Sequence, residues 1–225
     1  MPPGSLKAIV FDLDGTLIDS APDLRAALNR LLAGQERHAL TIEQVKMMIG
    51  DGAMKLVERA FAVTGPEIAA AKLAAMTAAF LEDYEMNSAV LTRPFPAVVE
   101  TLARLGNKGY TLALCTNKPQ TATMQTLDCL ELADYFQAVI GGDLLPGLRK
   151  PDPRHLLAAL ERLGVAASGA VMVGDNANDV AVARGAGMPV ILVTFGYSRI
   201  PAAELGADAV ISCFDELPAA LLALS

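Results

Sequence analysis

The stretch from Ala8 to Leu17, AIVFDLDGTL, decides how the rest of this 225-residue sequence is interpreted. It joins four apolar residues to two acids, Asp12 and Asp14, and a glycine. A continuous apolar run of this length is typical of a strand that is buried on both faces. Asp-Gly is also a strong turn signal, but a turn does not require two acids directly after a buried strand. We therefore interpret Asp12 and Asp14 as functional residues.

Short apolar runs of the same kind recur at residues 112–115, 138–140, 170–173, 190–193 and 209–211. Helical patterns lie between them, over residues 96–105, 121–132 and 152–163. The last pattern has Asp152 as its N-cap, Pro153 at its first position and Gly164 just after its end. Strands that alternate with helices predict an α/β fold, with a Rossmann-like three-layer core around a mainly parallel sheet.

The block of residues 20–87 differs from the rest because it is rich in alanine and contains no strand-like run. Thr41 and Gln44 form a capping-box pattern, and Thr64-Gly65-Pro66 opens a helix expected to extend through Tyr84. We interpret the block as an all-α domain inserted after the first strand. The expected boundaries are 1–18 and 94–225 for the core domain and 19–93 for the inserted domain.

The composition excludes several classes of protein. Hydrophobic residues make up 53% of the chain and charged residues 19%, which excludes a disordered chain. The net charge of −7 argues against nucleic-acid binding, and the apolar runs are shorter than the roughly 18 residues of a membrane span. Three cysteines without a CxxC pair fit reduced thiols, so we expect a cytoplasmic protein. Residues 1–5 resemble a short flexible leader, and the oligomeric state, monomer or dimer, stays open.

Polar side chains follow the ends of the expected strands, at Asp12, Thr116-Asn117, Asp175 and Thr194. In open parallel sheets, ligands bind beyond the carboxyl ends of the strands, so these side chains should gather at one edge. Carboxylates packed together repel each other unless a cation offsets them. Because the candidate ligands are oxygens, the set suits Mg²⁺, which commonly shares its coordination shell with phosphate. The sequence therefore indicates a site for phosphoryl chemistry.

Other residues near this edge have both a functional and a structural interpretation. Lys150 is the candidate permanent cation of the site, although a lone lysine is more often solvated. Thr116 and Asn117 could donate hydrogen bonds to phosphate oxygens or cap a helix. Asp179 lies one helical turn after Asp175 and could face the site or only complement the helix dipole.

Four motifs occur in order along the chain: Asp12-Leu-Asp-Gly-Thr-Leu17, Thr116-Asn117-Lys118, Lys150-Pro151 and Gly174-Asp-Asn-Ala-Asn-Asp179. As an ordered set they resemble the four motifs of the haloacid dehalogenase superfamily, over nearly the whole chain. The helical insert between the first two motifs resembles the α-helical cap of some of its members. The resemblance implies a Rossmann-like catalytic core with an inserted cap domain.

Within that superfamily the chain is most similar to the phosphoglycolate phosphatases. The similarity rests on the stretches 48–53, 58–60, 95–96, 116–119, 139–143 and 194–197. The chain departs from that group at Asn176, where serine is common, and in residues 144–149, which are more apolar. The resemblance implies a phosphatase for a small phosphorylated metabolite, which converts 2-phosphoglycolate to glycolate and phosphate.

The resemblance also implies a role for each acid of the site. Asp12 attacks phosphorus and becomes an aspartyl-phosphate. Asp14 first protonates the leaving oxygen and then activates the water that hydrolyses this intermediate. Mg²⁺ is held by the Asp12 side chain, the Asp14 main-chain carbonyl and Asp175, and it offsets the repulsion between carboxylate and phosphate.

The phosphoryl oxygens are implied to be held by Thr116, Asn117 and Lys150, with Asp179 orienting Lys150 or metal-bound water. The cap is implied to close over the site and exclude water. Its loop from Gly50 to Gly52 either faces the substrate or is an ordinary turn between helices. The cap cations that could bind an anionic leaving group are Arg25, Lys46, Lys55 and Arg59.

Several alternatives stay open at this point. A sugar-phosphate mutase similar to β-phosphoglucomutase, or a phosphatase for another small sugar phosphate, would share nearly all of these motifs. A dehalogenase would need no acid at Asp14, and a phosphonate hydrolase would use a cap lysine such as Lys55. A regulatory metal-binding protein without activity would tolerate the loss of Asp12. Cys115 is interpreted as a buried apolar residue, and its sensitivity to oxidation stays open.

Overall fold

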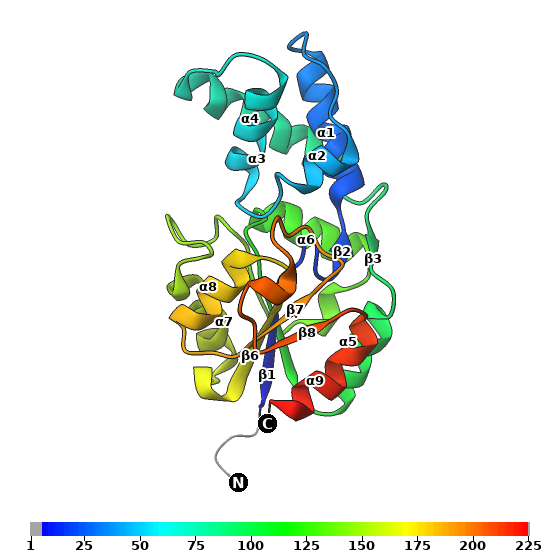
Figure 1. Cartoon of the computed structure of the whole chain (residues 1–225), viewed down its shortest axis with the longest axis vertical. Coiled ribbons are helices and arrows are strands. Elements are labelled where there is room, and N and C mark those ends of the chain that lie inside the picture. The colour runs from blue at the N-terminus through cyan, green and yellow to red at the C-terminus, as the bar shows by residue number, and fades with distance from the viewer. Residues whose placement is uncertain (1–5, 225) are drawn as a thin grey trace.

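The computed structural model describes residues 6–224, which form a core and a helical unit above it (Figure 1). The leader expected at residues 1–5 lies outside the described residues. No helix within 6–224 is both long enough and apolar enough to cross a membrane.

The core is built around a six-stranded sheet in which all neighbouring strands run parallel. Its strands are β1 (Ala8–Phe11), β4 (Thr111–Cys115), β5 (Ala138–Ile140), β6 (Ala170–Gly174), β7 (Val190–Val193) and β8 (Ala209–Ile211). Their order is β5-β4-β1-β6-β7-β8, so β1 lies at the centre between β4 and β6. All six apolar runs that were predicted as strands are strands, and the predicted α/β fold is confirmed.

Helices cover both faces of the sheet (Figure 1). One face carries α5 (Val98–Asn107), α6 (Gln120–Cys129) and α9 (Leu217–Ala223), and the other carries α7 (Pro153–Leu163) and α8 (Ala177–Gly185). Short 3-10 helices lie in the connections: η1 (Ala133–Tyr135), η2 (Ala167–Gly169), η3 (Ala202–Glu204) and η4 (Phe214–Glu216). Along β1, Ile9 and Phe11 enter the first apolar layer, and Ala8 and Val10 enter the second. The central strands β1 and β6 are buried on both faces and are apolar throughout, whereas the edge strand β8 is only partly buried.

The helical unit, which we call the cap, consists of α1 (Ala21–Ala33), α2 (Ile42–Lys46), α3 (Ala53–Thr64) and α4 (Ala70–Met86). It has an apolar core of its own, and Ala122 of α6 packs into it. The chain leaves and re-enters the core through an antiparallel pair of short strands, β2 (Ile18–Asp19) and β3 (Arg93–Pro94). The expected domain boundaries fall within this pair.

The predicted helix caps at Thr41 and Asp152 are present. The Thr41 side chain accepts from the N–H of Gln44, and the Gln44 side chain accepts in return from the N–H of Thr41, which completes the capping box. Asp152 accepts from the N–H of Arg154 in the first turn of α7. These local signals therefore predicted the beginnings of both helices.

The prediction that Thr64–Pro66 opens a helix was wrong, because α4 begins only at Ala70. Thr64 instead belongs to the last turn of α3, where its hydroxyl donates to the Ala60 carbonyl at 2.7 Å. Arg37 donates to the carbonyl of Pro66 at 2.6 Å. In a helix that began here, the Pro66 carbonyl would accept from the N–H of residue 70, but it accepts from Arg37 instead. The segment therefore connects α3 to α4.

Candidate active site

Asp12 stands at the carboxyl end of the central strand β1. Its N–H donates to the carbonyl of Val173 at 2.9 Å, which extends the β1–β6 ladder by one residue. Gly15, with a φ of +87°, then turns the chain, and a Cβ at this position would lie 2.5 Å from Oδ2 of Asp175. The turn predicted from Asp14-Gly15 is therefore present. Because Gly15 has no side chain, the loop can also lie directly against Asp175.

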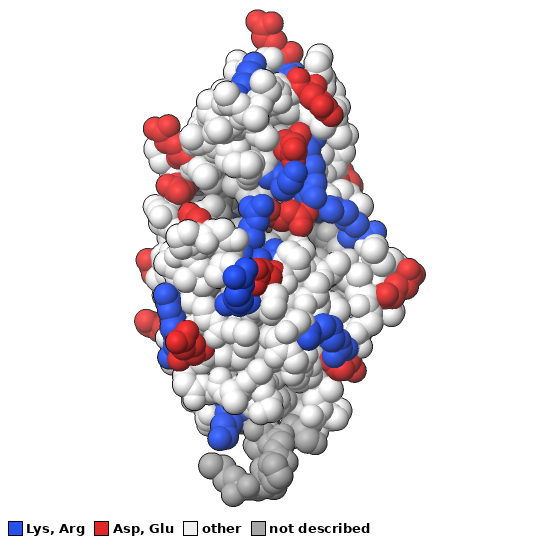
Figure 2. All heavy atoms as spheres, turned by 90° about the vertical axis from the view of Figure 1, so that its left-hand side faces the viewer, with Lys and Arg blue, Asp and Glu red and all other residues white. Residues whose placement is uncertain are grey.

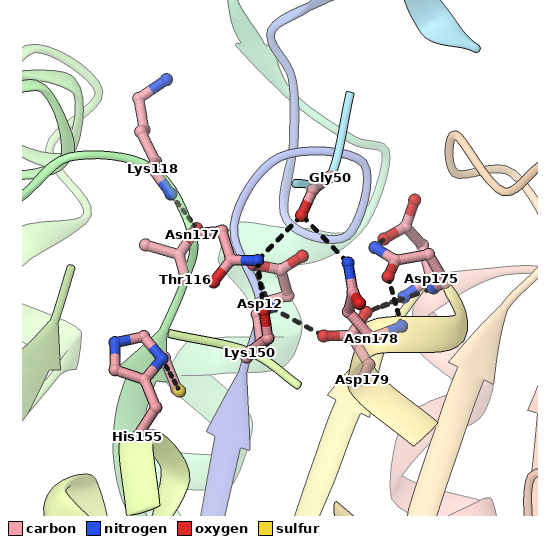
Figure 3. A network of polar contacts seen from close by, with 12 residues as sticks. Asp12, Gly50, Thr116, Asn117, Lys118, Lys150, His155, Asp175, Asn178 and Asp179 are labelled. Carbon is pink, nitrogen blue, oxygen red and sulfur yellow. Dashed lines mark hydrogen bonds and ion pairs between the residues drawn. The ribbon is translucent and has the colours of Figure 1, made fainter. Parts of the chain in front are cut away.

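Lys150 lies between Asp12 and Asp179 (Figure 3). Its Nζ is 2.8 Å from Oδ1 of Asp12 and 2.7 Å from Oδ1 of Asp179, and its side chain is only 1% exposed. Burial by itself opposes the charged form, but the two carboxylates raise the pKa of Lys150 well above its ordinary value. Lys150 is therefore a buried, permanently charged side chain, and the interpretation as a solvated lysine was wrong.

Both carboxylate oxygens of Asp179 have partners in the core. Oδ1 accepts from Lys150, and Oδ2 accepts from the N–H groups of Asp175 and Asn176 at 3.0 and 3.2 Å. With Asn176, Asp179 forms the capping box of α8. A Cβ on Gly174 would lie 2.2 Å from Cγ of Asp179, so this position requires glycine. Asp179 thus faces the site through Lys150 and also lies in the first turn of α8, so both interpretations of this acid describe one arrangement.

Asp175 is held from two sides. Its Oδ2 accepts from the N–H of Tyr197 at 2.6 Å, and its Oδ1 accepts from the side chain of Asn176 at 2.8 Å. Asp12, Asp175 and Asp179 each offer a carboxylate oxygen, and these oxygens all lie within 4.8 Å of one another. Two of these acids follow strands β1 and β6, and the third lies in the first turn of α8. The fold therefore brings acids from separate elements together in one buried cluster.

This acidic cluster carries more negative than positive charge. Burial raises the pKa of Asp12 from 3.8 to about 6, although Lys150 opposes the increase. Burial, followed by Asp179 and Asp12, also raises the pKa of Asp175. Three buried carboxylates facing one lysine, all with oxygen donors, fit a divalent cation, which would supply the missing positive charge. Asp12 and Asp175 are the side chains that would hold it, because they follow the paired strands β1 and β6, whereas Asp179 is the partner of Lys150.

We expect Mg²⁺ to stabilise the protein strongly near pH 8 and weakly near pH 5. The pKa of Asp12 is raised in the fold, so its stabilising contribution is present below pH 3.8 and is lost as the pH rises through about 6. Above that pH the charged cluster destabilises the fold and a divalent cation relieves it. At about 100 times its Kd the cation should add about 2.7 kcal/mol, a Tm increase of roughly 5–10 °C in thermal denaturation. An equal increase at both pH values, or an undiminished one in Asp175→Asn, would contradict this assignment.

Asp14 is connected to the cap through Lys118. The Nζ of Lys118 lies 3.2 Å from Oδ1 of Asp14 and donates to the hydroxyl of Tyr84 in α4 at 2.5 Å. Although burial opposes the charged form, Asp14 and Tyr84 keep the pKa of Lys118 above its ordinary value. Sequence reasoning did not single out Lys118 or Tyr84 as site residues. The position of Lys118 directly after Thr116-Asn117 was a usable signal, whereas Tyr84 carried none.

Thr116 and Asn117, expected to donate to phosphate, follow β4 and are both buried. The Thr116 hydroxyl accepts from the N–H of Lys118 at 3.2 Å. The Asn117 side chain donates to the carbonyls of Gly50 and Lys150, at 2.9 and 3.0 Å (Figure 3). Asn117 thus joins the cap loop to the Lys150 loop, while Thr116 faces the cavity described below.

The loop from Gly50 to Gly52 is the part of the cap that lies over the site. The carbonyl of Gly50 accepts from Asn117 and also from Asn178, at 3.2 Å. Asp51 accepts from Asn178 at 2.7 Å and forms ion pairs with Arg59 and Arg199, at 2.5 and 3.2 Å. Figure 2 shows basic and acidic side chains gathered on one face at the height of the boundary between cap and core. The loop is therefore both a turn between helices and one of the contacts between the cap and the core.

A small cavity of about 50 Å³ separates the cap from the core. Its polar side is lined by Asp12, Asp14, Gly50, Gly52, Thr116, Asn117 and Lys118, and its apolar side by residues that include Leu24, Ile49, Leu56 and Phe80. Among the described residues that line it, Lys118 is the only cation.

The cap cations suggested as contacts of the leaving group are engaged elsewhere. Lys55 pairs with Glu58 on the surface, and Arg59 pairs with Asp51. Lys46 lies over the ring of Tyr197, and Arg25, like the other three, is not among the described residues that line the cavity. The cation that pairs with Asp14, Lys118, comes from the core and not from the cap.

Cys115 lies just behind Thr116 and is fully buried. Its Sγ is 3.4 Å from Nδ1 of His155, whose Nε2 is 3.1 Å from the carbonyl of Gly141. Burial raises the pKa of the Cys115 thiol to about 12, so the thiol stays protonated and is a poor nucleophile. The structure therefore supports the interpretation of Cys115 as an apolar core residue.

This chain is similar to known proteins over most of its length. The family described as haloacid dehalogenase-like hydrolase matches residues 9–193. A phosphoglycolate phosphatase of Caulobacter vibrioides is 45% identical over 216 residues, which cover 96% of this chain and 91% of that protein. A phosphoglycolate phosphatase of Rhodospirillum rubrum is 44% identical over 94% of this chain and 89% of that protein. The crystal structure of a predicted phosphoglycolate phosphatase from Haemophilus somnus aligns with a TM-score of 0.90 and 31% identity, over 96% of this chain and 97% of that one.

Proposed function

Because this chain belongs to the haloacid dehalogenase-like hydrolases and is a phosphatase, we propose that it hydrolyses 2-phosphoglycolate to glycolate and phosphate. The reaction depends on Mg²⁺ and proceeds through an aspartyl-phosphate on Asp12. The observation that carries the proposal is the buried cluster at the end of β1, in which Lys150 holds Asp12 and Asp179 holds Lys150. Asp14 lies two residues after the nucleophile Asp12, from where it can donate a proton to the leaving oxygen.

The proposed reaction has two half-reactions. A carboxylate oxygen of Asp12 attacks phosphorus while the bond to the ester oxygen breaks, and Asp14 gives that oxygen a proton. Asp14 then takes a proton from water, which attacks the aspartyl-phosphate, releases phosphate and restores Asp12. Lys150 and Thr116 hold the phosphoryl oxygens through both steps. Asp12, Asp175 and the main-chain carbonyl of Asp14 would hold Mg²⁺, which would supply positive charge between carboxylate and phosphate.

We also propose that residues 19–93 act as a cap domain over the core formed by 1–18 and 94–225. Contacts of Gly50 with Asn117 and Asn178 support this role, because they hold the cap loop directly above the site. A cap in this position excludes bulk water while the carboxylate attacks. The small cavity beneath it favours a small leaving group over a sugar.

The substrate assignment is tested with a panel of phosphomonoesters at saturating Mg²⁺. We expect 2-phosphoglycolate to exceed glycerol phosphate and glucose 6-phosphate in kcat/KM by about 100-fold, with stoichiometric release of phosphate. A chelator should abolish the release. Conversion of a sugar phosphate to its isomer without free phosphate would indicate the mutase alternative, and a higher kcat/KM for a sugar phosphate would reject the substrate assignment. The alternative that uses Lys55 gains no support, because this side chain is 48% exposed and paired with Glu58.

A further inference from the structure

Lys118 is an unusual lysine because it is buried beside the reaction centre but takes no part in the phosphoryl chemistry described above. Its side chain is 3% exposed, and it extends from the loop after β4, while Lys150 lies deeper between two acids (Figure 3). Removing a charged side chain from water is costly. A function for this charge inside the cavity is therefore expected.

The contacts of Lys118 leave room for a ligand. An ammonium group has three N–H donors. Within residues 6–224, Nζ of Lys118 donates hydrogen bonds to two partners, Oδ1 of Asp14 at 3.2 Å and the hydroxyl of Tyr84 at 2.5 Å. The distance to Asp14 is at the long end for a charge-assisted hydrogen bond, so this contact can be exchanged. The third donor is available to a group in the cavity.

We propose that Lys118 binds the carboxylate of the leaving group and so selects esters of 2-hydroxy carboxylic acids over neutral phosphomonoesters. The inference rests on the proposed function and names the residue that would confer the substrate preference. In such an ester, the carboxylate is bonded to the carbon that carries the ester oxygen. When the ester oxygen meets Asp14, the carboxylate therefore lies beside Lys118, whose Nζ is 3.2 Å from that acid.

The remaining surface of the cavity strengthens this selection. The wall opposite the polar groups is apolar, with Leu56 and Phe80 among its residues, and Lys118 is the only cation in the described lining. A carboxylate that enters this space loses its hydration and finds one positive partner. A substrate without a carboxylate leaves the Lys118 charge without a ligand, so it gains no compensating interaction.

A different role for Lys118 would be to hold the cap closed, because it connects Tyr84 of α4 with Asp14 of the core. The two roles predict different kinetics. A closing contact affects every substrate alike, whereas a carboxylate contact affects only substrates that carry a carboxylate. The ratio of kcat/KM for two such substrates therefore distinguishes them.

The test compares 2-phosphoglycolate with 2-hydroxyethyl phosphate, which replaces the carboxylate with a neutral alcohol. In the wild type we expect a ratio of kcat/KM of about 100 in favour of 2-phosphoglycolate. In Lys118→Met this ratio should fall to near one, mainly through a higher KM for 2-phosphoglycolate. Lys118→Arg, which keeps the charge, should restore part of the preference. A ratio that stays high in Lys118→Met would overturn the proposal.

Tyr84→Phe is the matched control, because it removes the hydrogen bond to the cap and keeps the ring and the lysine charge. It should lower kcat/KM for both substrates by the same factor and leave the ratio unchanged. If the ratio falls in Tyr84→Phe as far as it does in Lys118→Met, the charge of Lys118 does not by itself determine the preference, which would overturn the proposal. A wild type that hydrolyses both esters equally rejects the inference and keeps the phosphatase, whereas a wild type that releases phosphate from neither rejects the proposed function.

A measurement on the wild type alone covers the case in which Lys118→Met fails to fold. Glycolate should compete with p-nitrophenyl phosphate, and ethylene glycol, which has the same size without the charge, should not. Equal inhibition by both compounds, or by neither, would contradict a carboxylate site.

Discussion

Replacing Asp12 with asparagine should lower kcat for phosphate release by on the order of 10⁴-fold or more. The amide has nearly the same shape as the carboxylate, but it cannot form a stable acyl-phosphate. Stopped reactions of the wild type should contain protein-bound phosphate on residue 12, and the variant should contain none. Wild-type turnover in Asp12→Asn, or phosphate attached to another residue, would reject Asp12 as the nucleophile.

The same substitution should leave the metal-free fold intact or make it more stable near pH 8. Burial raises the pKa of Asp12 to about 6, so the ionised side chain opposes folding above that pH. A neutral amide removes this cost, while Lys150 keeps its contact with Asp179 at 2.7 Å. Activity and Tm should therefore change in opposite directions. Asp128→Asn, which alters an exposed acid of α6, is the control and should change neither.

Replacing Lys150 with methionine should destabilise the protein by about 3–5 kcal/mol. The side chain is 1% exposed and is the partner of both Asp12 and Asp179, so its loss leaves two buried carboxylates without a cation. The Tm should fall by roughly 10 °C, and kcat should fall by about 100-fold or more at temperatures where the variant is folded. Lys108→Met, at an exposed position, should have little effect.

The pH dependence identifies the cause of that destabilisation. Lys150 lowers the pKa of Asp12, so its removal should raise that pKa further above its present value of about 6. The variant should therefore regain stability toward low pH, where Asp12 is protonated, and lose most near pH 8. In the double variant Lys150→Met/Asp179→Asn, stability should partly return but activity should not. A destabilisation that is independent of pH would indicate lost packing and not lost charge.

The strands, and the meeting of Asp12 with Asp175 at the edge of the sheet, could be predicted from the sequence because their signals are local. A strand that is covered on both faces is typically apolar along its length, and all six apolar runs are strands. Parallel strands present their carboxyl ends at one edge, so Asp12 and Asp175, which directly follow β1 and β6, had to meet once the sheet formed. The helix N-cap signals at Thr41 and Asp152 are also local, because each involves residues only a few positions apart.

The surroundings of these acids depend instead on contacts between segments that no local pattern connects. Lys118 meets Asp14 across 104 positions within the core and Tyr84 of the cap across 34, and the second contact exists only when the cap rests on the core. For the same reason, the sequence suggested Arg25, Lys46, Lys55 and Arg59 of the cap as cations for the leaving group, whereas the only cation in the cavity lining within residues 6–224 is Lys118 of the core. The positions of the acids directly after apolar runs determine which acids meet at the edge of the sheet, because hydrogen bonding between parallel strands aligns the strand ends. Packing between the two domains specifies what surrounds the leaving group, because only docking decides which side chains are enclosed together.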